Sequence, residues 1–134
     1  TSKIIDRIKA INDFYEAGYD VHVNYSPIIM YDDFVKGYTK LFKLVDEIVD
    51  DKIKSKVKAE CIFLTHNKEM HNYNIINGVK DEKLIWRPDL QEPKTSEYGC
   101  LNIRYKHFYK DRYIKTFKTM LKDNASWQSI RYIF

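Results

Sequence analysis

Cysteine, glycine and proline are all scarce in this sequence of 134 residues, which contains two, four and three of them respectively. So little glycine and proline excludes a collagen-like chain or a flexible linker. The cysteines, Cys61 and Cys100, lie 39 positions apart and are too few and too distant for a cysteine-only metal site. No apolar run approaches the ~20 residues of a membrane-spanning helix, and no signal-peptide pattern opens the chain. We therefore predict a soluble, cytoplasmic protein with no membrane partner.

Positive charge is concentrated in one part of the chain. The net charge is only +4, but eight Lys and Arg against two acidic residues give residues 94–122 a charge of +6, which leaves −2 elsewhere. Aromatic residues are interleaved with this charge, namely Tyr98, Tyr105, Phe108, Tyr109 and Tyr113. Basic side chains can neutralise phosphates while aromatic rings stack on bases, so the segment favours nucleic-acid binding. The alternative is a solvated helix face beside ordinary core aromatics.

The spacing of apolar residues predicts an α/β protein. It indicates helices over 2–16 and from about 32 to 50, and strands over 20–27, ended by Pro27, and 56–65. This order is typical of an α/β layer with a parallel sheet. The second half is less regular. Its expected elements are a short helix over 66–77, a loop over 80–94, a hairpin over 96–107 turning near Tyr98-Gly99, an amphipathic helix over 109–122 and a strand over 129–134.

Polar residues follow both predicted strands of the first half. Asn24 and Ser26 come at the end of the first strand, and His66 follows the second. Ligands of α/β sheets bind at the carboxyl ends of strands, so these residues are candidates for holding a polar ligand, with Pro27 fixing the turn. Ordinary turn residues at a capped strand end are the alternative.

Metal binding is not predicted. His66, Glu69 and His71 have offsets of three and five, whereas two ligands on one helix need spacings of three or four. We expect His66 to be a hydrogen-bonding residue at a strand end and His22 to be a packed or surface imidazole. The sequence identifies no nucleophile and no general acid–base pair.

Several segments together resemble the C-terminal part of the spore photoproduct lyase family, which are radical S-adenosylmethionine (AdoMet) enzymes that reverse a thymine-dimer lesion in DNA. The matching segments are Arg7–Ile11, Glu16–Ile28, Gly37-Tyr38, Leu41-Phe42, Glu60–Asn67, Trp86–Pro88, Gln91-Glu92, Lys94, Tyr98-Gly99, Asn102–Tyr105 and Ile130–Phe134. The resemblance implies the end of a partial (β/α) barrel, expected over residues 1–80, followed over 81–134 by a C-terminal lobe with a β-hairpin and a basic amphipathic helix.

The resemblance also implies site residues. Asn24, Ser26 and Pro27 would approach the cavity for cofactor and lesion, with His66 at the next strand end. The hairpin that enters damaged duplex DNA in the family matches residues 96–99, where Tyr98 and Gly99 are retained but Glu97 replaces a basic residue. The DNA contacts expected are Tyr98, Gly99, Arg104, Lys106 and Lys110.

The three closely spaced cysteines that hold a [4Fe–4S] cluster in radical AdoMet enzymes are not in this sequence. No catalytic residue is therefore predicted here, and the chain is not expected to be active alone. We expect the cluster and AdoMet in a longer parent protein, whose N-terminal catalytic half acts in cis or in trans. One alternative is a stand-alone, non-catalytic module that binds nucleic acid or protein. Another is a radical enzyme of the same superfamily with a different substrate.

Overall fold

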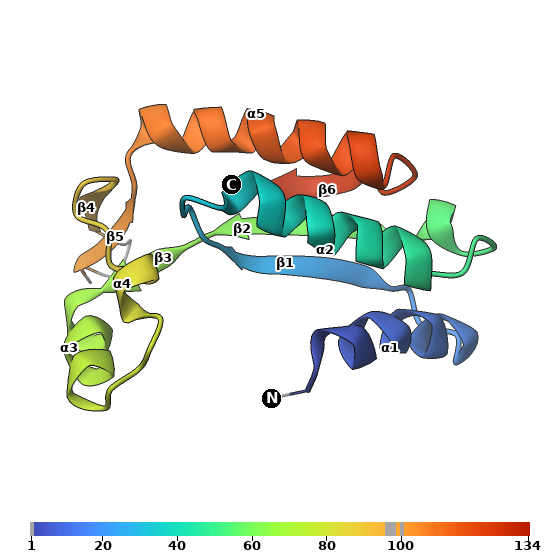
Figure 1. Cartoon of the computed structure of the whole chain (residues 1–134), viewed down its shortest axis with the longest axis horizontal. Helices are drawn as coiled ribbons and strands as arrows, with labels where there is room; N and C mark the ends of the chain where they lie inside the picture. The colour runs from blue at the N-terminus through green and yellow to red at the C-terminus, as the bar shows by residue number, and fades with distance from the viewer. Residues whose placement is uncertain (1, 96–98, 100) are drawn as a thin grey trace.

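Two three-stranded sheets organise the chain in a computed structural model that describes residues 2–95, 99 and 101–134 (Figure 1). Strands β1, β2 and β6 form one sheet, and β3, β5 and β4 form the other, each in that spatial order. In chain order the elements are α1 (Ile4–Glu16), β1 (His22–Ile28), α2 (Phe34–Ile48), a 3₁₀ turn (Lys54–Lys56), β2 (Lys58–Phe63), β3 (Thr65–Asn67), α3 (Lys68–Ile76), α4 (Glu82–Ile85), β4 (Gln91–Thr95), β5 (Leu101–Tyr105), α5 (His107–Asn124) and β6 (Ile130–Ile133).

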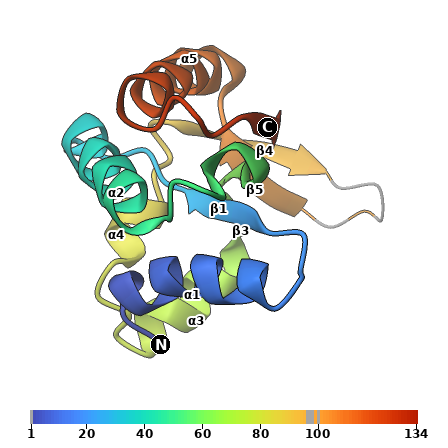
Figure 2. The ribbon, with the colours of Figure 1, turned by 90° about the vertical axis from the view of Figure 1, so that its right-hand side faces the viewer.

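The first sheet is entirely parallel, as the sequence predicts. β2 is its central strand and pairs with β1 on one side and β6 on the other. Helices α2 and α5 pack on one face of this sheet (Figures 1 and 2). Parallel strands need helical crossovers, and α2 connects β1 to β2 in this way.

Aromatic rings fill the space between the helices and this sheet. Phe117 of α5 is fully buried and makes edge-to-face contacts with Phe42, Tyr25 and Tyr38, with ring centroids 5.1–5.9 Å apart. The periodic apolar residues of α2 and α5 therefore serve to bury one helix face each against the strands. Burial of rings this large dominates the stability of the layer.

The second sheet is antiparallel and is inserted between β2 and α5. β4 and β5 form a hairpin, and the short strand β3 pairs with the other edge of β5. The sequence places the first arm of this hairpin after residue 96, but it runs from Gln91 to Thr95, inside the segment predicted as a loop. The short helix α4 also lies in that segment. The predicted turn near Tyr98-Gly99 falls largely outside the described residues, but Gly99 is described and has a φ of 77°, a conformation that favours glycine.

The expected division of the chain at residue 80 does not separate the two sheets. After the insertion, α5 returns along the first sheet and β6 pairs with β2, so both belong to the parallel layer. The lobe, defined here as residues 65–106, projects beyond the carboxyl ends of β1 and β2 (Figure 1).

Pro27 does not end the first strand. Pairing with β2 shifts in register after Tyr25 and resumes at Ile28, which is opposite Phe63. Pro27 follows a cis peptide bond and lies at this irregularity, where its missing N–H leaves no ladder bond unmade.

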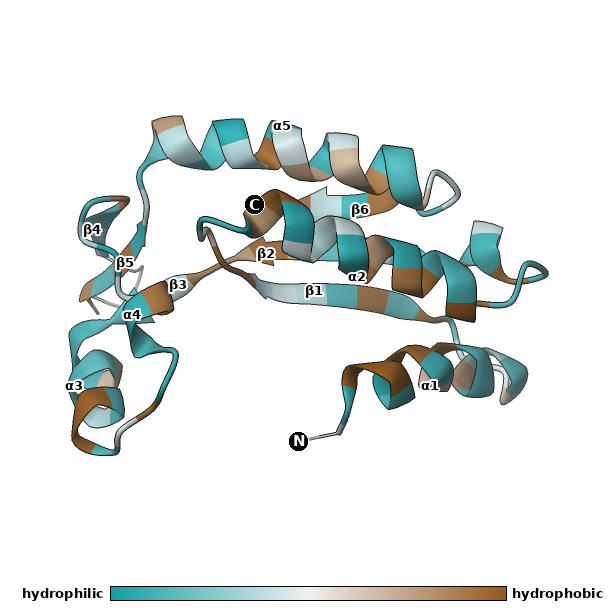
Figure 3. Cartoon of the chain, in the orientation of Figure 1, coloured by the Kyte–Doolittle hydropathy of each residue, from teal (hydrophilic) through white to brown (hydrophobic). Residues whose placement is uncertain are grey.

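Helix α1 packs beside α2 through Ile8 and Ile11, while Ile4 and Phe14 remain exposed. Figure 3 colours apolar residues along α1 and α3, and Ile75 and Ile76 of α3 are also exposed. None of the helices in the described part of the chain is long and apolar enough to cross a membrane.

Candidate functional site

The face of the parallel sheet opposite α2 and α5 carries polar side chains. Residues of β2 alternate between the two faces, as a strand requires. Ala59, Cys61 and Phe63 are buried against the helices, whereas Glu60 and Ile62 lie on the other face and are only partly buried. In parallel α/β sheets and barrels, such strands deliver functional side chains at their carboxyl ends.

Glu60 is the centre of a polar cluster on this face. Its Oε1 lies 3.0 Å from Nδ1 of His22 in β1 and accepts a hydrogen bond of 2.8 Å from Nη1 of Arg131. Its Oε2 accepts a bond of 2.7 Å from the hydroxyl of Tyr132 in β6. All three strands of the sheet therefore contribute to one charged network.

These contacts stabilise the charged form of the carboxylate. The Tyr132 hydroxyl, followed by Arg131 and His22, holds the pKa of Glu60 below its ordinary value. The same hydrogen bond to Glu60 raises the pKa of Tyr132. The cluster is thus an ion pair at neutral pH, with the Tyr132 proton retained on its oxygen.

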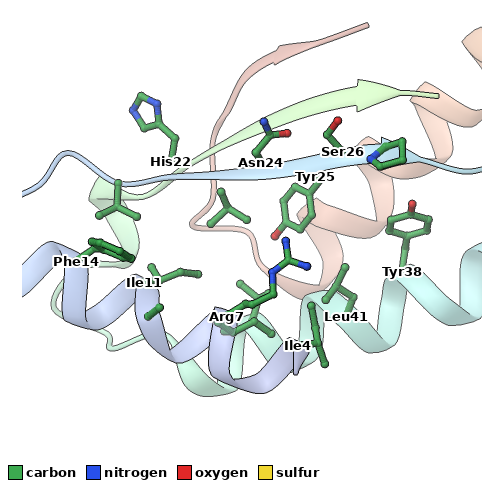
Figure 4. Close-up of a pocket in the computed structure, with 16 residues that line it drawn as sticks. Ile4, Arg7, Ile11, Phe14, His22, Asn24, Tyr25, Ser26, Tyr38 and Leu41 are labelled. Atoms are coloured by element: carbon green, nitrogen blue, oxygen red, sulfur yellow. The ribbon is translucent and has the colours of Figure 1, made fainter. Parts of the chain in front are cut away.

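Asn24, Ser26 and Pro27 lie together along β1, as predicted. Figure 4 shows Asn24 and Ser26 on the side of the strand away from α1 and α2, and Tyr25 pointing toward the helices. On its other side, β1 borders a hollow of about 400 Å³ between α1, α2 and β1, in which the side chain of Arg7 lies (Figure 4). The side chains of Asn24 and Ser26 point away from this hollow.

The carboxyl end of β1 is held by two tyrosine hydroxyls. The hydroxyl of Tyr38 accepts a hydrogen bond from the Ile29 N–H at 3.2 Å, and that of Tyr105 accepts one from the Met30 N–H at 3.0 Å. Burial raises the pKa of Tyr38 to about 12, so this phenol stays neutral. These two hydrogen bonds therefore fix the backbone that follows the polar end of β1.

His66 is not part of this group. It lies in β3, is buried, and contacts Glu82 of α4 and the ring of Trp86. The prediction that His66 is a hydrogen-bonding residue is correct, but its partners belong to the lobe and not to the end of β1.

The predicted DNA contacts flank the hairpin. Arg104 lies in β5 and is paired with Glu92 of β4, with Nη2 3.2 Å from Oε1. Lys106 precedes α5 and donates to the Asp89 carbonyl oxygen at 3.0 Å, and Lys110 follows in the first turns of that helix. Gly99 is exposed, whereas Tyr98 lies outside the described residues. The three basic residues, called the basic path below, thus follow one another along the chain from β5 into the first turns of α5.

The cysteines do not fit the ligand set of a [4Fe–4S] cluster. Cys61 is 0% exposed and faces the helices, and burial raises the pKa of its thiol to about 12. Cluster ligands are thiolates, so this thiol is unsuited to the task. Cys100 lies outside the described residues.

Comparison with known proteins identifies the family of this chain. A family model described as spore photoproduct lyase matches residues 1–133. The chain belongs to the spore photoproduct lyase family. No curated protein matches it at a significant level.

Solved structures of spore photoproduct lyase share this fold over the whole chain. One is a double mutant, cysteine to alanine and serine to cysteine, with bound AdoMet and dinucleoside spore photoproduct; it matches with a TM-score of 0.86 and 19% identity. Another, complexed with dinucleoside spore photoproduct, matches with a TM-score of 0.81 and 19% identity. Each match covers 100% of this chain and 39% of the other. The chain therefore spans about two fifths of these lyases and has the fold of their matching part.

The sequence alone did not reveal the Glu60 cluster. It predicts only that His22 is a packed or surface imidazole. The alternation of Lys58, Glu60 and Ile62 with the apolar positions of β2 was the available signal, since it places a carboxylate on the face without helices. Arg131 and Tyr132 could not be assigned to it without knowing that β6 pairs with β2.

Proposed function

We propose that this chain forms the C-terminal part of a spore photoproduct lyase-like radical AdoMet protein, in which it supplies a wall of the lesion cavity and contacts to DNA during repair of a thymine-dimer lesion. The observation that carries the proposal is the polar face of the parallel sheet opposite α2 and α5, together with the basic path from β5 into α5, in a chain of this family.

The wall would be made by β1. Asn24 and Ser26 present an amide and a hydroxyl on the side of the strand away from the helices (Figure 4). Such groups can donate to or accept from the polar edges of nucleobases and riboses. Related lyases are complexed with dinucleoside spore photoproduct, a ligand of this chemistry.

The DNA contacts would be made by Lys106 and Lys110, together with Tyr98 and Gly99 of the hairpin. Arg104 contributes less charge than the sequence suggests, because Glu92 already pairs with its guanidinium. Lysines at the junction of β5 and α5 can neutralise phosphates next to the end of the sheet.

The cluster and AdoMet would be held by another part of the protein or by a second polypeptide. Two cysteines 39 positions apart do not supply the closely spaced ligands of a cluster, so no step of the radical chemistry is assigned to this chain. Its proposed role is to bind and orient the lesion.

Affinity for duplex DNA at several salt concentrations tests the DNA contacts. Replacing Lys106 and Lys110 with Gln should flatten the slope of log affinity against log salt by about 0.9 for each lost phosphate contact. The matched control is Lys40→Gln with Lys43→Gln, an equal loss of charge on exposed positions of α2. Equal slopes for the two double variants would overturn the proposed DNA contacts.

A lesion-containing duplex tests the wall and the hairpin. Asn24→Ala should reduce the preference for the damaged duplex while leaving affinity for undamaged DNA unchanged, because Asn24 carries no charge that could neutralise a phosphate. Tyr98→Ala should also reduce this preference, as the family resemblance implies. If the wild-type chain binds damaged and undamaged duplexes equally, the lesion-cavity role is wrong, and a general nucleic-acid-binding module remains.

A further inference from the structure

Two histidines and a glutamate meet in the lobe, away from the polar face of the parallel sheet. His66 comes from β3, His71 from α3 and Glu82 from α4, and one ligand atom of each lies within 4.8 Å of the other two. Spacing on a single helix could not reveal this set, because its members belong to three elements. The carboxylate that completes it is Glu82, not Glu69.

Both histidine rings contact the same carboxylate oxygen. Nε2 of His66 lies 3.0 Å and Nδ1 of His71 lies 2.5 Å from Oε1 of Glu82. The second oxygen, Oε2, accepts a hydrogen bond of 2.5 Å from the Asn74 amide. Glu82 is 2% exposed and His66 is 8% exposed. A carboxylate is rarely buried to this extent unless it is paired or coordinates a metal ion.

The orientation of the imidazole rings is set by their surroundings. The ring of His71 stacks on the indole of Trp86, with centroids 3.9 Å apart and planes 11° apart. The same indole contacts His66 edge-on. The start of α3 is fixed as well, since the Asn67 side chain accepts a hydrogen bond of 2.7 Å from the Met70 N–H. Rings held in this way lose little entropy when they bind a ligand.

The cluster around Glu82 differs from the one around Glu60 in the charge of its partners. Both contain a carboxylate and a neighbouring histidine, but Arg131 supplies a permanent cation to Glu60. The only ion-pair partners of Glu82 in the described part of the chain are His66 and His71. Glu82 therefore has no permanent cation among these partners, and both partners are imidazoles, which are common metal ligands.

Space for a further ligand adjoins the cluster. A hollow of about 360 Å³, open to solvent, is lined by His71, Asn74, Glu82 and Trp86, among others. Two histidines and one glutamate with an open fourth position are the donor set of many catalytic zinc sites.

We propose that Nε2 of His66, Nδ1 of His71 and Oε1 of Glu82 bind one divalent transition-metal ion of the zinc type, with the fourth position open to the adjoining hollow. Nitrogen and oxygen ligands at ~2.0–2.1 Å from zinc lie roughly 3.3 Å apart at the tetrahedral angle. The two contacts to Glu82, 3.0 Å and 2.5 Å, are shorter than this, and the two histidine atoms lie within 4.8 Å of each other, so side-chain adjustments would bring all three ligand atoms around one ion. The hydrogen bond from Asn74 would then orient the ligating carboxylate.

Titration of the metal-free 134-residue chain with Co²⁺, followed by Zn²⁺, tests the site. Co²⁺ should bind in a 1:1 ratio with the visible d–d bands of a four-coordinate ion, and Zn²⁺ should displace it. His71→Gln and Glu82→Gln should each weaken the affinity by at least about 100-fold, because each removes a direct ligand. The matched control is His22→Gln, which alters the other histidine–glutamate pair and should leave the titration unchanged.

A second measurement excludes an effect of misfolding. Zn²⁺ should raise the melting temperature of the wild-type chain and of His22→Gln, but not that of His71→Gln, which changes a residue at the rim of the hollow. The proposal is overturned if His71→Gln binds Co²⁺ as tightly as wild type, if the spectrum shows thiolate charge-transfer bands, or if no saturable 1:1 binding occurs.

Discussion

The parallel layer and the lobe are stabilised in different ways. Between the first sheet and its helices the interior is aromatic and aliphatic, with Phe117 and Phe42 at its centre. The lobe contains three of the four buried polar residues of the described chain, namely His66, Glu82 and Gln91. Gln91 donates to the Ile85 carbonyl oxygen and accepts from the Arg87 N–H, each at 2.7 Å, so it fastens the segment before β4.

This difference indicates that the two regions have different roles. A layer stabilised by apolar burial is insensitive to local polar changes and suits a supporting wall. A small lobe stabilised by polar networks opens at lower free energy and responds to ligands that bind those polar groups. The two tryptophans allow the regions to be followed separately, since Trp127 bonds to Asp46 in the layer and Trp86 stacks on His71 in the lobe.

The largest loss of stability is expected from Phe117→Ala. Removing a fully buried ring that contacts several others should lower the free energy of unfolding by about 3–5 kcal/mol, and both tryptophan signals should move to lower denaturant together. Urea unfolding measures this. Phe108→Ala is the control, because Phe108 is 77% exposed and its loss should cost less than about 0.5 kcal/mol. A similar cost for both would show that the aromatic core does not dominate the layer.

A smaller and more local loss is expected from Glu82→Ala with chelator present. It leaves His66, His71 and Asn74 without their shared acceptor, at a cost of about 3 kcal/mol. In a Trp127→Phe background, Trp86 fluorescence should report earlier unfolding of the lobe. Amide exchange in β2 should stay close to that of wild type. Unfolding of both regions at one midpoint would mean that the lobe is not a separate unit of stability.

The smallest effect is expected from Glu60→Gln, and it should depend on pH. The pKa of Glu60 in the folded chain lies below its ordinary value of 4.5. The ionised carboxylate therefore stabilises the fold above the unfolded pKa, and this contribution is lost as the pH falls through the folded pKa. Melting temperatures should consequently show less acid destabilisation for the variant than for wild type. Parallel pH profiles would contradict the ion-pair description of the cluster.

The sequence predicted the parallel layer because its signals are local and periodic. The apolar spacing of α1, α2 and α5 and the apolar residues of β1, β2 and β6 report directly which face is buried. The first arm of the hairpin was missed because Gln91–Thr95 contains Pro93 and shows no apolar alternation. Its pairing with β5 satisfies the backbone without a buried side-chain face.

Residues that share a face were predicted only where they are close in sequence. Asn24 and Ser26 alternate along β1 and lie on the same side of it, as strand periodicity requires, and their role in a cavity wall stays a prediction. The Glu60 and Glu82 clusters join residues from three elements each, so no spacing rule could assemble them. For Glu60 the decisive fact is the pairing of β6 with β2, and for Glu82 it is the return of α4 toward β3.

The most direct test of the account is a footprint of lesion-containing duplex DNA on the chain by amide hydrogen exchange. The account predicts slower exchange at the carboxyl end of β1 and from β5 into the first turns of α5, with no change along α2, where Lys36, Lys40 and Lys43 offer exposed positive charge. Protection along α2, or none at β1 and β5, would contradict the claim that the polar sheet face and the basic path both contact DNA.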